Sequence, residues 1–205
     1  MNTRYLALMS VALLGGVSSA STYICVPGQT DYPVSANGTA SVEVYLQETF
    51  SGVSQLVSEK GIYGYDLEVT RTVGSAFIAA AAANSAQFTS VLSVSYNPNP
   101  IPLSGSATVD LSVSALDNPG PEGSLSGNTR SILLGTFTIQ AGSSGQSRFS
   151  TIDSTFFGTN TITNSGSALD STILPGSFTI TVVPEPAMLG LIATGGLLLL
   201  RRRRA

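Results

Sequence analysis

Short segments in which apolar and polar residues alternate recur along the middle of this chain. Val42, Val44 and Leu46 fall on one face of their segment, with polar or half-polar side chains between them. A period of two is typical of a strand with one buried face. We therefore expect an all-β fold, an antiparallel β-sandwich. The other segments of this kind are Tyr63–Val69, Val91–Tyr96, Thr108–Ala115, Leu133–Ile139 and Ser177–Val182, with weaker ones at Ser147–Ile152 and Asn160–Thr163.

The composition favours the same fold. The chain of 205 residues holds 30 Ser, 21 Thr and 21 Gly, and only 10% of its residues are charged. Such a composition suits strands and turns, and a helical bundle needs more Leu, Glu, Lys and Ala. One segment departs from the pattern, because Ala76–Asn84 has the composition of a short helix. We expect this Ala-rich helix, closed by Asn84, to cross between the second and third strands.

The residues that are missing exclude several kinds of chemistry. The chain has no His and one Cys. Without an imidazole, neither a Ser-His-Asp triad nor the common zinc and haem sites can form, and a single Cys forms no intrachain disulfide. We expect no enzyme. Cys25 lies near the start of the body, and we expect a partly buried thiol near a frayed end, with an intermolecular disulfide as the alternative.

The first twenty residues read as a secretory signal peptide. Arg4 is followed by the apolar run Leu6–Val17, and small residues end the segment. A basic start, an apolar stretch and small residues before the cleavage point define such a signal. We expect a signal helix over residues 1–20 and cleavage between Ala20 and Ser21; the alternative is a short buried helix.

The last 22 residues have three parts. Pro184, Glu185 and Pro186 end the preceding strand, because proline interrupts both helices and strands. The apolar run Ala187–Leu200 has 14 residues, about 21 Å as a helix against about 30 Å for a bilayer core. The chain closes on a basic cluster that is costly to move through a membrane, so we expect a single transmembrane helix with the body outside. The cluster consists of Arg201, Arg202, Arg203 and Arg204.

This order of motif, short helix and arginines resembles the PEP-CTERM sorting tail of exported bacterial proteins. The resemblance implies handling by an exosortase, a membrane enzyme that acts at or near the motif and passes the protein to the cell surface or extracellular matrix. On it, Pro184, Glu185 and Pro186 are recognised, the run Ala187–Leu200 holds the tail in the membrane, and the arginines stop transfer. An uncleaved single-span anchor is the alternative.

Between the ends lies one body, residues 21–183. It carries eleven acidic and four basic side chains, a net charge of −7. Binding to nucleic acid or to anionic lipid needs clustered positive charge, so we expect neither as a partner of the body.

The body resembles cohesin-type sandwiches in three places. An early strand Val42–Leu46 is followed by the Gly-aromatic strand Gly64–Thr70, and the late strand Leu134–Ile139 has the form Gly-x-Phe. The resemblance covers about residues 39–183 and implies an Ig/cohesin-like sandwich. Cohesins bind dockerin modules through a sheet face, and no residue here is singled out as such an interface.

Paired carboxylates are the residues here that could act chemically. Asp66 and Glu68 share a strand face that we expect to be solvated; the alternative is a catalytic pair of a hydrolase or a set of calcium ligands. Asp110 and Asp117 form a second pair. Oxygen ligands near Asp117, Asn118 and Glu122 would suit calcium, although their spacing matches no EF-hand. We otherwise expect no cofactor.

We therefore expect an exported bacterial envelope protein with a structural or adhesive role at the cell surface or in the extracellular matrix. Its expected parts are the signal peptide 1–20, the β-sandwich body 21–183 and the sorting tail 184–205. Expected partners are an exosortase-type enzyme, the membrane, and extracellular polysaccharide or another surface protein. The alternatives are a carbohydrate- or protein-binding module of cohesin-like type, and a carboxylate-based hydrolase.

Overall fold

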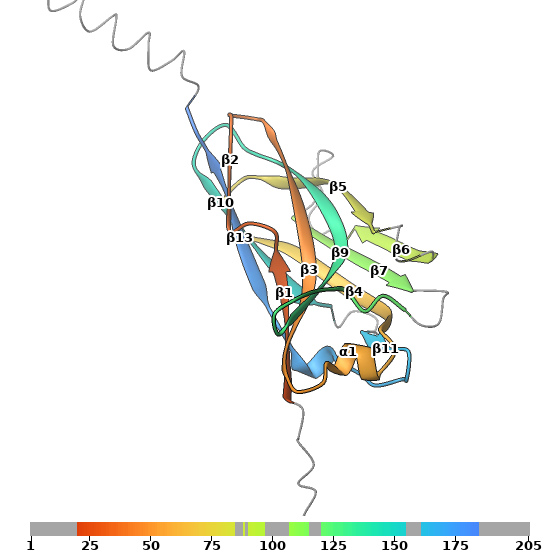
Figure 1. Cartoon of the computed structure of the whole chain (residues 1–205). Helices are drawn as coiled ribbons and strands as arrows, with labels where there is room; N and C mark the ends of the chain where they lie inside the picture. The colour runs from red at the N-terminus through yellow and green to blue at the C-terminus, as the bar shows by residue number, and fades with distance from the viewer. Residues whose placement is uncertain are drawn as a thin grey trace, which may run out of the picture.

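The chain folds into two β-sheets packed face to face (Figure 1). The computed structural model describes residues 20–84, 88, 90–96, 107–114, 120–154 and 161–184. The expected all-β sandwich is confirmed for this part of the chain. The described chain enters at one end of the elongated body and leaves at the opposite end (Figure 1).

One sheet holds the longest strand of the described residues. Its strands are β1 (Ala20–Pro27), β3 (Thr39–Ser51), β5 (Phe77–Ala83), β8 (Ser124–Ser126), β9 (Thr129–Gln140) and β12 (Ile173–Leu174). They are ordered β12–β1–β3–β9–β5, and β8 also pairs with β9. The antiparallel pair β3–β9 runs from Thr39 opposite Gln140 to Thr49 opposite Thr129. We call this sheet the first sheet.

The second sheet carries the candidate site. Its strands are β2 (Asp31–Val34), β4 (Ile62–Val73), β6 (Ser90–Tyr96), β7 (Thr108–Ser114), β10 (Gln146–Asp153), β11 (Ile162–Thr163) and β13 (Gly176–Val182). The order is β2–β13–β10–β4–β7–β6, and β11 pairs with β4 beyond the end of β10.

The expectation of a wholly antiparallel sandwich is wrong at one edge of each sheet. β12 pairs with β1 in parallel, and β2 pairs with β13 in parallel. At both places the chain changes sheets, from β1 to β2 and from β12 to β13, instead of turning back in a hairpin. A strand that changes sheets can run in the same direction as its new neighbour.

The core fills the space between the two sheets. Val42 and Val44 are fully buried and Leu46 is 1% exposed, so the alternation in β3 places its apolar face as predicted. On the second sheet, the rings of Phe149 and Phe178 stack with centroids 5.0 Å apart. Such a core stabilises the sandwich through apolar burial and close packing.

The Ala-rich segment is a strand, and the helix expected over Ala76–Asn84 is wrong. In β5, Ile78 lies opposite Ile139 and Ala82 opposite Thr136 of β9. A helix of this length is marginal in water because its nucleation is costly, whereas pairing with β9 satisfies the backbone groups of both strands. Ile78 is 1% exposed and anchors the segment in the core.

One short helix, α1 (Gln55–Ser58), follows β3 and begins on a buried carboxylate. Glu48 is fully buried and accepts hydrogen bonds from the Ser54 hydroxyl at 2.5 Å and from the Gln55 N–H at 2.6 Å. The Ser21 hydroxyl of β1 donates to the same carboxylate at 2.6 Å, and the hydroxyl of Tyr23 and the N–H of Leu56 donate at 3.4 Å. Glu48 therefore joins β1, β3 and the first turn of α1.

Candidate functional site

The outer face of the second sheet is rich in hydroxyl side chains. Thr179 on β13 lies opposite Arg148 on β10, which in turn lies opposite Val73 on β4. In the next row, Ser150 lies between Ser177 and Thr70. We call the face formed by these six residues the hydroxyl face.

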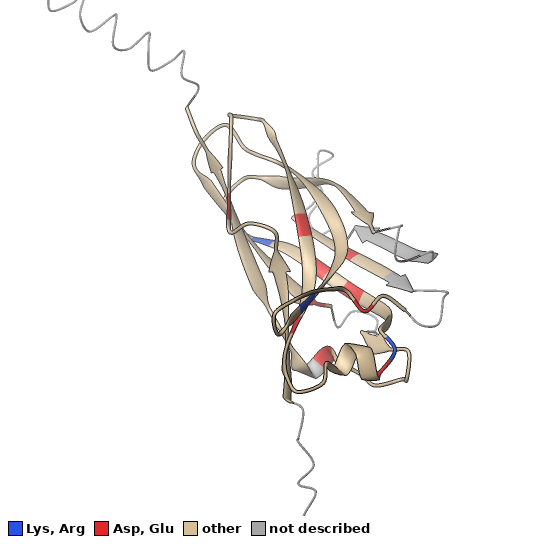
Figure 2. Ribbon diagram, in the orientation of Figure 1, with Lys and Arg blue, Asp and Glu red and all other residues tan. Residues whose placement is uncertain are grey.

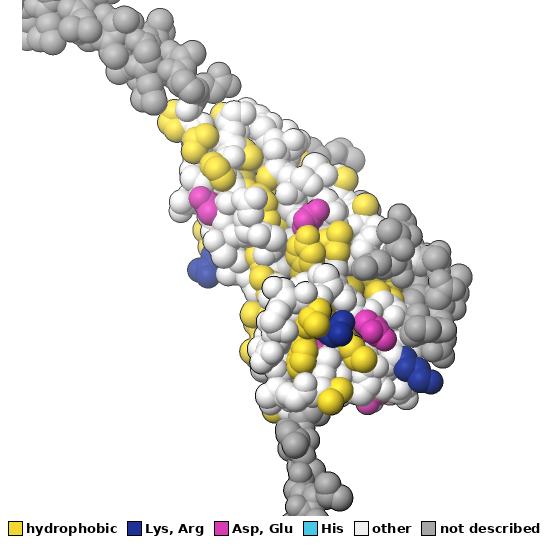
Figure 3. Space-filling view, in the orientation of Figure 1, with side chains coloured by type: hydrophobic (Ala, Val, Ile, Leu, Met, Phe, Trp, Pro, Cys, Tyr) yellow, Lys and Arg dark blue, Asp and Glu magenta, His cyan; other side chains and the backbone are white. Residues whose placement is uncertain are grey.

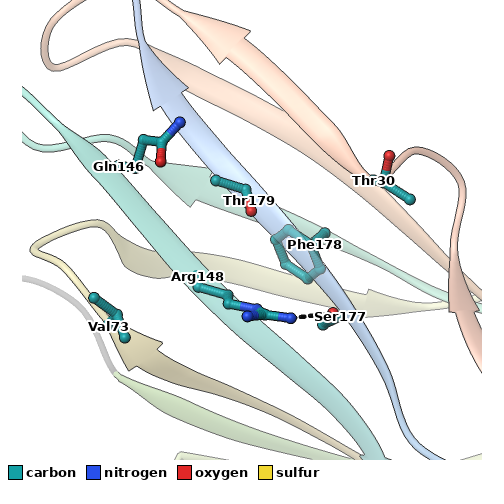
Figure 4. Close-up of a pocket in the computed structure, with 7 residues that line it drawn as sticks. All are labelled: Thr30, Val73, Gln146, Arg148, Ser177, Phe178 and Thr179. Atoms are coloured by element: carbon teal, nitrogen blue, oxygen red, sulfur yellow. Dashed lines mark hydrogen bonds between the residues drawn. The ribbon is translucent and has the colours of Figure 1, made fainter.

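An open groove of about 460 Å³ crosses this face (Figure 4). The Arg148 side chain extends along the groove, and its Nη2 donates to the Ser177 hydroxyl at 3.3 Å. At the end of the groove, Gln146 Nε2 donates to the Thr181 hydroxyl at 3.3 Å. The lining residues are Thr30, Val73, Gln146, Arg148, Ser177, Phe178 and Thr179.

The lining residues of this groove present no exposed aromatic ring. Phe178, the aromatic residue among them, is 1% exposed, and its ring packs inward against Tyr32 and Phe149. Sugar rings are commonly held by exposed aromatic side chains, because aromatic faces offer a large apolar contact area. The groove instead offers hydroxyls, one amide and one guanidinium, which suit hydrogen bonds to polar groups.

Charged side chains are sparse on the described surface. In the view of Figure 3 a few charged side chains lie among white and yellow atoms. Arg148 is exposed and accompanied by hydroxyls, so its guanidinium is available to a carboxylate of a partner.

Carboxyl groups gather further along the same sheet, on β4 and β7 (Figure 2). Glu68 lies opposite Asp110, and Asp66 lies two residues before Glu68 on β4. Burial, and then the charge of Asp110, raise the pKa of Asp66 from an ordinary 3.8 to about 7. Burial also raises the pKa of Asp110, against a hydrogen bond from the Ser154 hydroxyl at 3.1 Å.

Two further carboxyls lie beside this group, at the end of β10 and on the 3₁₀ turn η1 (Asp170–Thr172). Asp170 adds, after burial, to the rise in the pKa of Asp153. Thr161 contacts both, since its hydroxyl donates to Asp153 Oδ1 and its N–H donates to Asp170 Oδ1 at 3.0 Å. Burial raises the pKa of Asp153 to about 7.

The structure corrects the expectation of a solvated face at Asp66 and Glu68. Asp66 is 1% exposed, whereas Glu68 is half-buried. The alternation of β4 is broken at this point because Ser154 and Thr161 lie against Asp66, with the Ser154 N–H donating to the Asp66 carbonyl at 2.8 Å. Tyr63, which the alternation places on the same face as buried Tyr65, is 44% exposed. Burial leaves Asp66 poorly placed to reach a hydrolase substrate.

Asp110 is brought together with Glu68 and Asp66, and its other expected partner, Asp117, lies outside the described residues. Asn118 also lies outside them, and Glu122 is half-buried in the loop before β8. Within the described ranges, no group of three or more Asp, Glu or Cys side chains has a geometry that could hold a metal ion.

Cys25 lies in the middle of β1 and is 2% exposed. Burial raises the pKa of its thiol to about 12. The position at a frayed end that we expected is therefore wrong, and burial excludes an intermolecular disulfide in this folded state, because a thiol must reach its partner to react.

The expected terminal sites fall at the limits of the described chain. Ala20 and Ser21 are the first two residues of β1, so the expected cleavage point lies at the start of a strand. Pro184 is exposed and follows Val183, whose N–H donates to the Val34 carbonyl at 2.8 Å. Residues 1–19, Glu185, Pro186, the run Ala187–Leu200 and the four terminal arginines lie outside the described residues. Among the residues that are described, no helix is long and apolar enough to cross a membrane.

The sequence does not single out the hydroxyl face. Arg148 and Thr179 are 31 positions apart and meet only through the pairing of β10 with β13. Ser and Thr are common throughout the chain, so their concentration on one face has no local signature. The alternation Gln146-Ser147-Arg148 was the one available signal, because it predicts that Gln146 and Arg148 point to the same side.

The described residues thus define an all-β sandwich with a polar outer face, a class that serves many functions. No protein-family model matches the chain, and a search of curated proteins found no similar sequence. A solved type II cohesin domain from the cellulosome of Acetivibrio cellulolyticus has 10% sequence identity and a TM-score of 0.38, over 77% of this chain and 94% of that chain. An N-terminal interface mutant of a type II cohesin–X-dockerin complex from Acetivibrio cellulolyticus has 9% identity and a TM-score of 0.36, over 81% and 97%. Neither likeness assigns a partner to this chain.

Proposed function

We propose that this chain is a non-enzymatic protein-binding module of an exported protein, and that its hydroxyl face is the partner surface. The observation that carries the proposal is the groove across β13, β10 and β4, where exposed Arg148 lies among hydroxyls. Interfaces gain specificity from such hydrogen-bonding groups and are often centred on an arginine.

A protein is favoured over a polysaccharide as the ligand. The groove's aromatic residue, Phe178, is buried, so a sugar ring would find no platform to stack on within it. Arg148 also gives the face one defined charge, which would pair with an acidic side chain of the partner. A structural or adhesive role at the cell surface is compatible with such binding, since adhesion needs a partner surface.

The binding proposal is tested with two matched variants of the purified protein. Thr179→Arg places a large charged side chain in the groove, and Ser41→Arg makes the same kind of change on the outer face of the first sheet, where Ser41 is exposed. Proteins captured from the extracellular fraction of the producing cells are identified and quantified for each variant. We expect Thr179→Arg to lose a partner that the parent and Ser41→Arg both retain. Equal loss with both variants, or a ligand found only on a glycan array, would contradict the proposal.

We also propose that the module is exported and sorted through its PEP-type tail. The support is the sequence of the two ends, together with the position of Pro184, which is exposed where the chain leaves the body. An exosortase-type enzyme would meet the motif one residue after the end of β13, since only Val183 lies between Val182 and Pro184. Surface or matrix localisation would follow from this processing.

Mass spectrometry of the mature protein tests the sorting proposal, because it gives both termini. We expect Ser21 at the start and loss of the four terminal arginines. A mature protein that keeps Arg201–Arg204 and stays in the membrane fraction would establish the uncleaved anchor in its place. The outcome is independent of whether the hydroxyl face binds a protein.

A further inference from the structure

The outer face of the first sheet carries an exposed carboxylate beside a tyrosine ring. Glu43 and Tyr45 are two residues apart on β3 and therefore point to the same side. The Tyr45 hydroxyl donates to Glu43 Oε2 at 2.6 Å, which fixes the ring and the carboxylate relative to one another. This hydrogen bond, together with burial, raises the pKa of Tyr45 to about 12, so the phenol is neutral near pH 7. The pair thus presents one fixed negative charge beside an aromatic ring.

An open hollow of about 270 Å³ lies next to this pair. The Gly28 N–H donates to the Glu43 carbonyl at 2.8 Å and holds the loop after β1 against β3. A Cβ at Gly28 would lie 3.7 Å from Cε2 of the Tyr45 ring and 3.7 Å from the Tyr32 hydroxyl, so the glycine leaves the space between them free. The hollow is lined by Gly28, Gln29, Tyr32, Ser41 and Glu43.

Apolar side chains flank the Tyr45 ring on both sides. Val26 on β1 and Leu133 on β9 lie opposite Tyr45 in the pairing with β3, and all three residues are half-buried. Together they form an apolar strip next to the Glu43 carboxylate. A side chain with an apolar stem and a charged head can lie along such a strip, as those of Lys and Arg do on protein surfaces.

The charge of this face favours a cation as the occupant. The body has a net charge of −7, and the described chain gives the Glu43 carboxylate one hydrogen bond, from Tyr45. A cation from outside would bond to this carboxylate and would be attracted by the electron-rich face of the ring. A neutral sugar could stack on the same ring, but it would gain no ion pair with Glu43. Three of the four basic side chains of the body donate hydrogen bonds elsewhere, namely Arg71 to the Ala76 carbonyl, Arg130 to the Gly123 carbonyl and Arg148 to the Ser177 hydroxyl.

We propose that the Glu43–Tyr45 pair and the hollow next to it bind a lysine or arginine side chain of a second protein partner. The charged head pairs with Glu43, and the apolar stem lies against Tyr45 and Val26. The opposite charges of the acidic body and a basic partner also speed their encounter. This site lies on the outer face of the first sheet and the hydroxyl face on that of the second, so either proposal can fail without the other.

Titration of the nitrogen-15-labelled protein with acetyl-tetralysine amide, followed by NMR at low salt, tests the site. We expect the largest amide shifts around Gly28 and Tyr45, and an affinity about fivefold lower in Glu43→Gln, the upper range for an exposed ion pair. Gly28→Val fills the hollow without changing the net charge, and it should also weaken binding. Asp31→Asn is the matched control and should keep the parent's affinity. Asp31 is exposed on β2 of the second sheet and accepts from the Thr181 hydroxyl at 2.7 Å, so the control removes an equal charge from a similar hydrogen bond.

Two results would overturn the proposal. One is a Glu43→Gln variant that binds tetralysine as tightly as Asp31→Asn does, because general attraction to the net charge would then explain the binding. The other is a parent protein whose amides around Tyr45 do not shift with tetralysine; if they shift with the neutral sugar cellopentaose instead, the site is one for a sugar. The position of the shifts in the parent is informative even if a variant fails to fold, and shifts spread evenly over the acidic residues would also contradict the site.

Discussion

Substitution of Glu48 gives the most direct test of which hydrogen bonds stabilise this sandwich. Its buried carboxylate accepts three short hydrogen bonds, from Ser21, Ser54 and Gln55, at 2.5 to 2.6 Å. Hydrogen bonds to a charged group contribute about 1.5–3 kcal/mol each, and the cost of burying the charge offsets part of that sum. We expect Glu48→Ala to lower the free energy of unfolding by about 4 kcal/mol, a large part of the 5–15 kcal/mol typical of a domain.

Glu48→Gln should cost about half as much, because it keeps the size and one acceptor oxygen but turns an amide toward the Ser54 hydroxyl. In urea, a loss of about 4 kcal/mol lowers the midpoint by about 2 M at a slope of about 2 kcal/mol per M. Glu43→Gln is the control, since Glu43 is exposed and accepts from the Tyr45 hydroxyl at 2.6 Å. A Glu48→Ala midpoint within about 0.5 M of the parent would refute this reasoning.

Three further results are expected. In urea denaturation, Ala80→Val should leave the free energy of unfolding unchanged or raise it by a few tenths of a kcal/mol, because Ala80 is exposed in β5 and β-branched residues favour strands. A decrease of about 0.5 kcal/mol or more would indicate a helix. The Cys25 thiol, with a pKa raised to about 12 by burial, should not react with a thiol reagent at pH 8 until urea unfolds the protein; fast stoichiometric labelling of the folded protein would contradict its position. Gly176→Ala should cost several kcal/mol or prevent folding, because a Cβ there would lie 1.9 Å from the Cys25 carbonyl oxygen; a thermal midpoint equal to the parent's would show that β1 and β13 are further apart.

Alternation of apolar and polar residues predicts strands well where one face of the strand is buried and the other is exposed to solvent. β3 meets that condition, and Val42, Val44 and Leu46 are buried as expected. β4 does not meet it near Asp66, where Ser154 and Thr161 lie against the strand and bury a carboxyl that the pattern places outside. Local pattern cannot indicate this, because the covering residues come about 90 positions later in the chain.

Helix propensity fails at Ala76–Asn84 for a related reason. Propensity describes an isolated segment, whereas β5 is held by backbone pairing with β9, a strand whose paired residues are some fifty to sixty positions away. The parallel edges and the hydroxyl face are equally non-local, since both depend on which strands become neighbours. The carboxyl cluster was predicted in part. The sequence indicated Asp66, Glu68 and Asp110 as candidate paired carboxylates, but it did not indicate Asp153 and Asp170, which lie beside them in the structure.

The opposite positions of Ala20 and Pro184 have a mechanical consequence. A body held at Pro184 and pulled at its other end carries the load lengthwise through β13, which lies between β10 and β2. A pull in that direction shears the strand along its neighbours, so the hydrogen bonds on both sides resist together instead of opening one after another. The parallel β2–β13 pair, in which Asp31 to Val34 are paired, thus strengthens the sandwich at the end where the force would be applied.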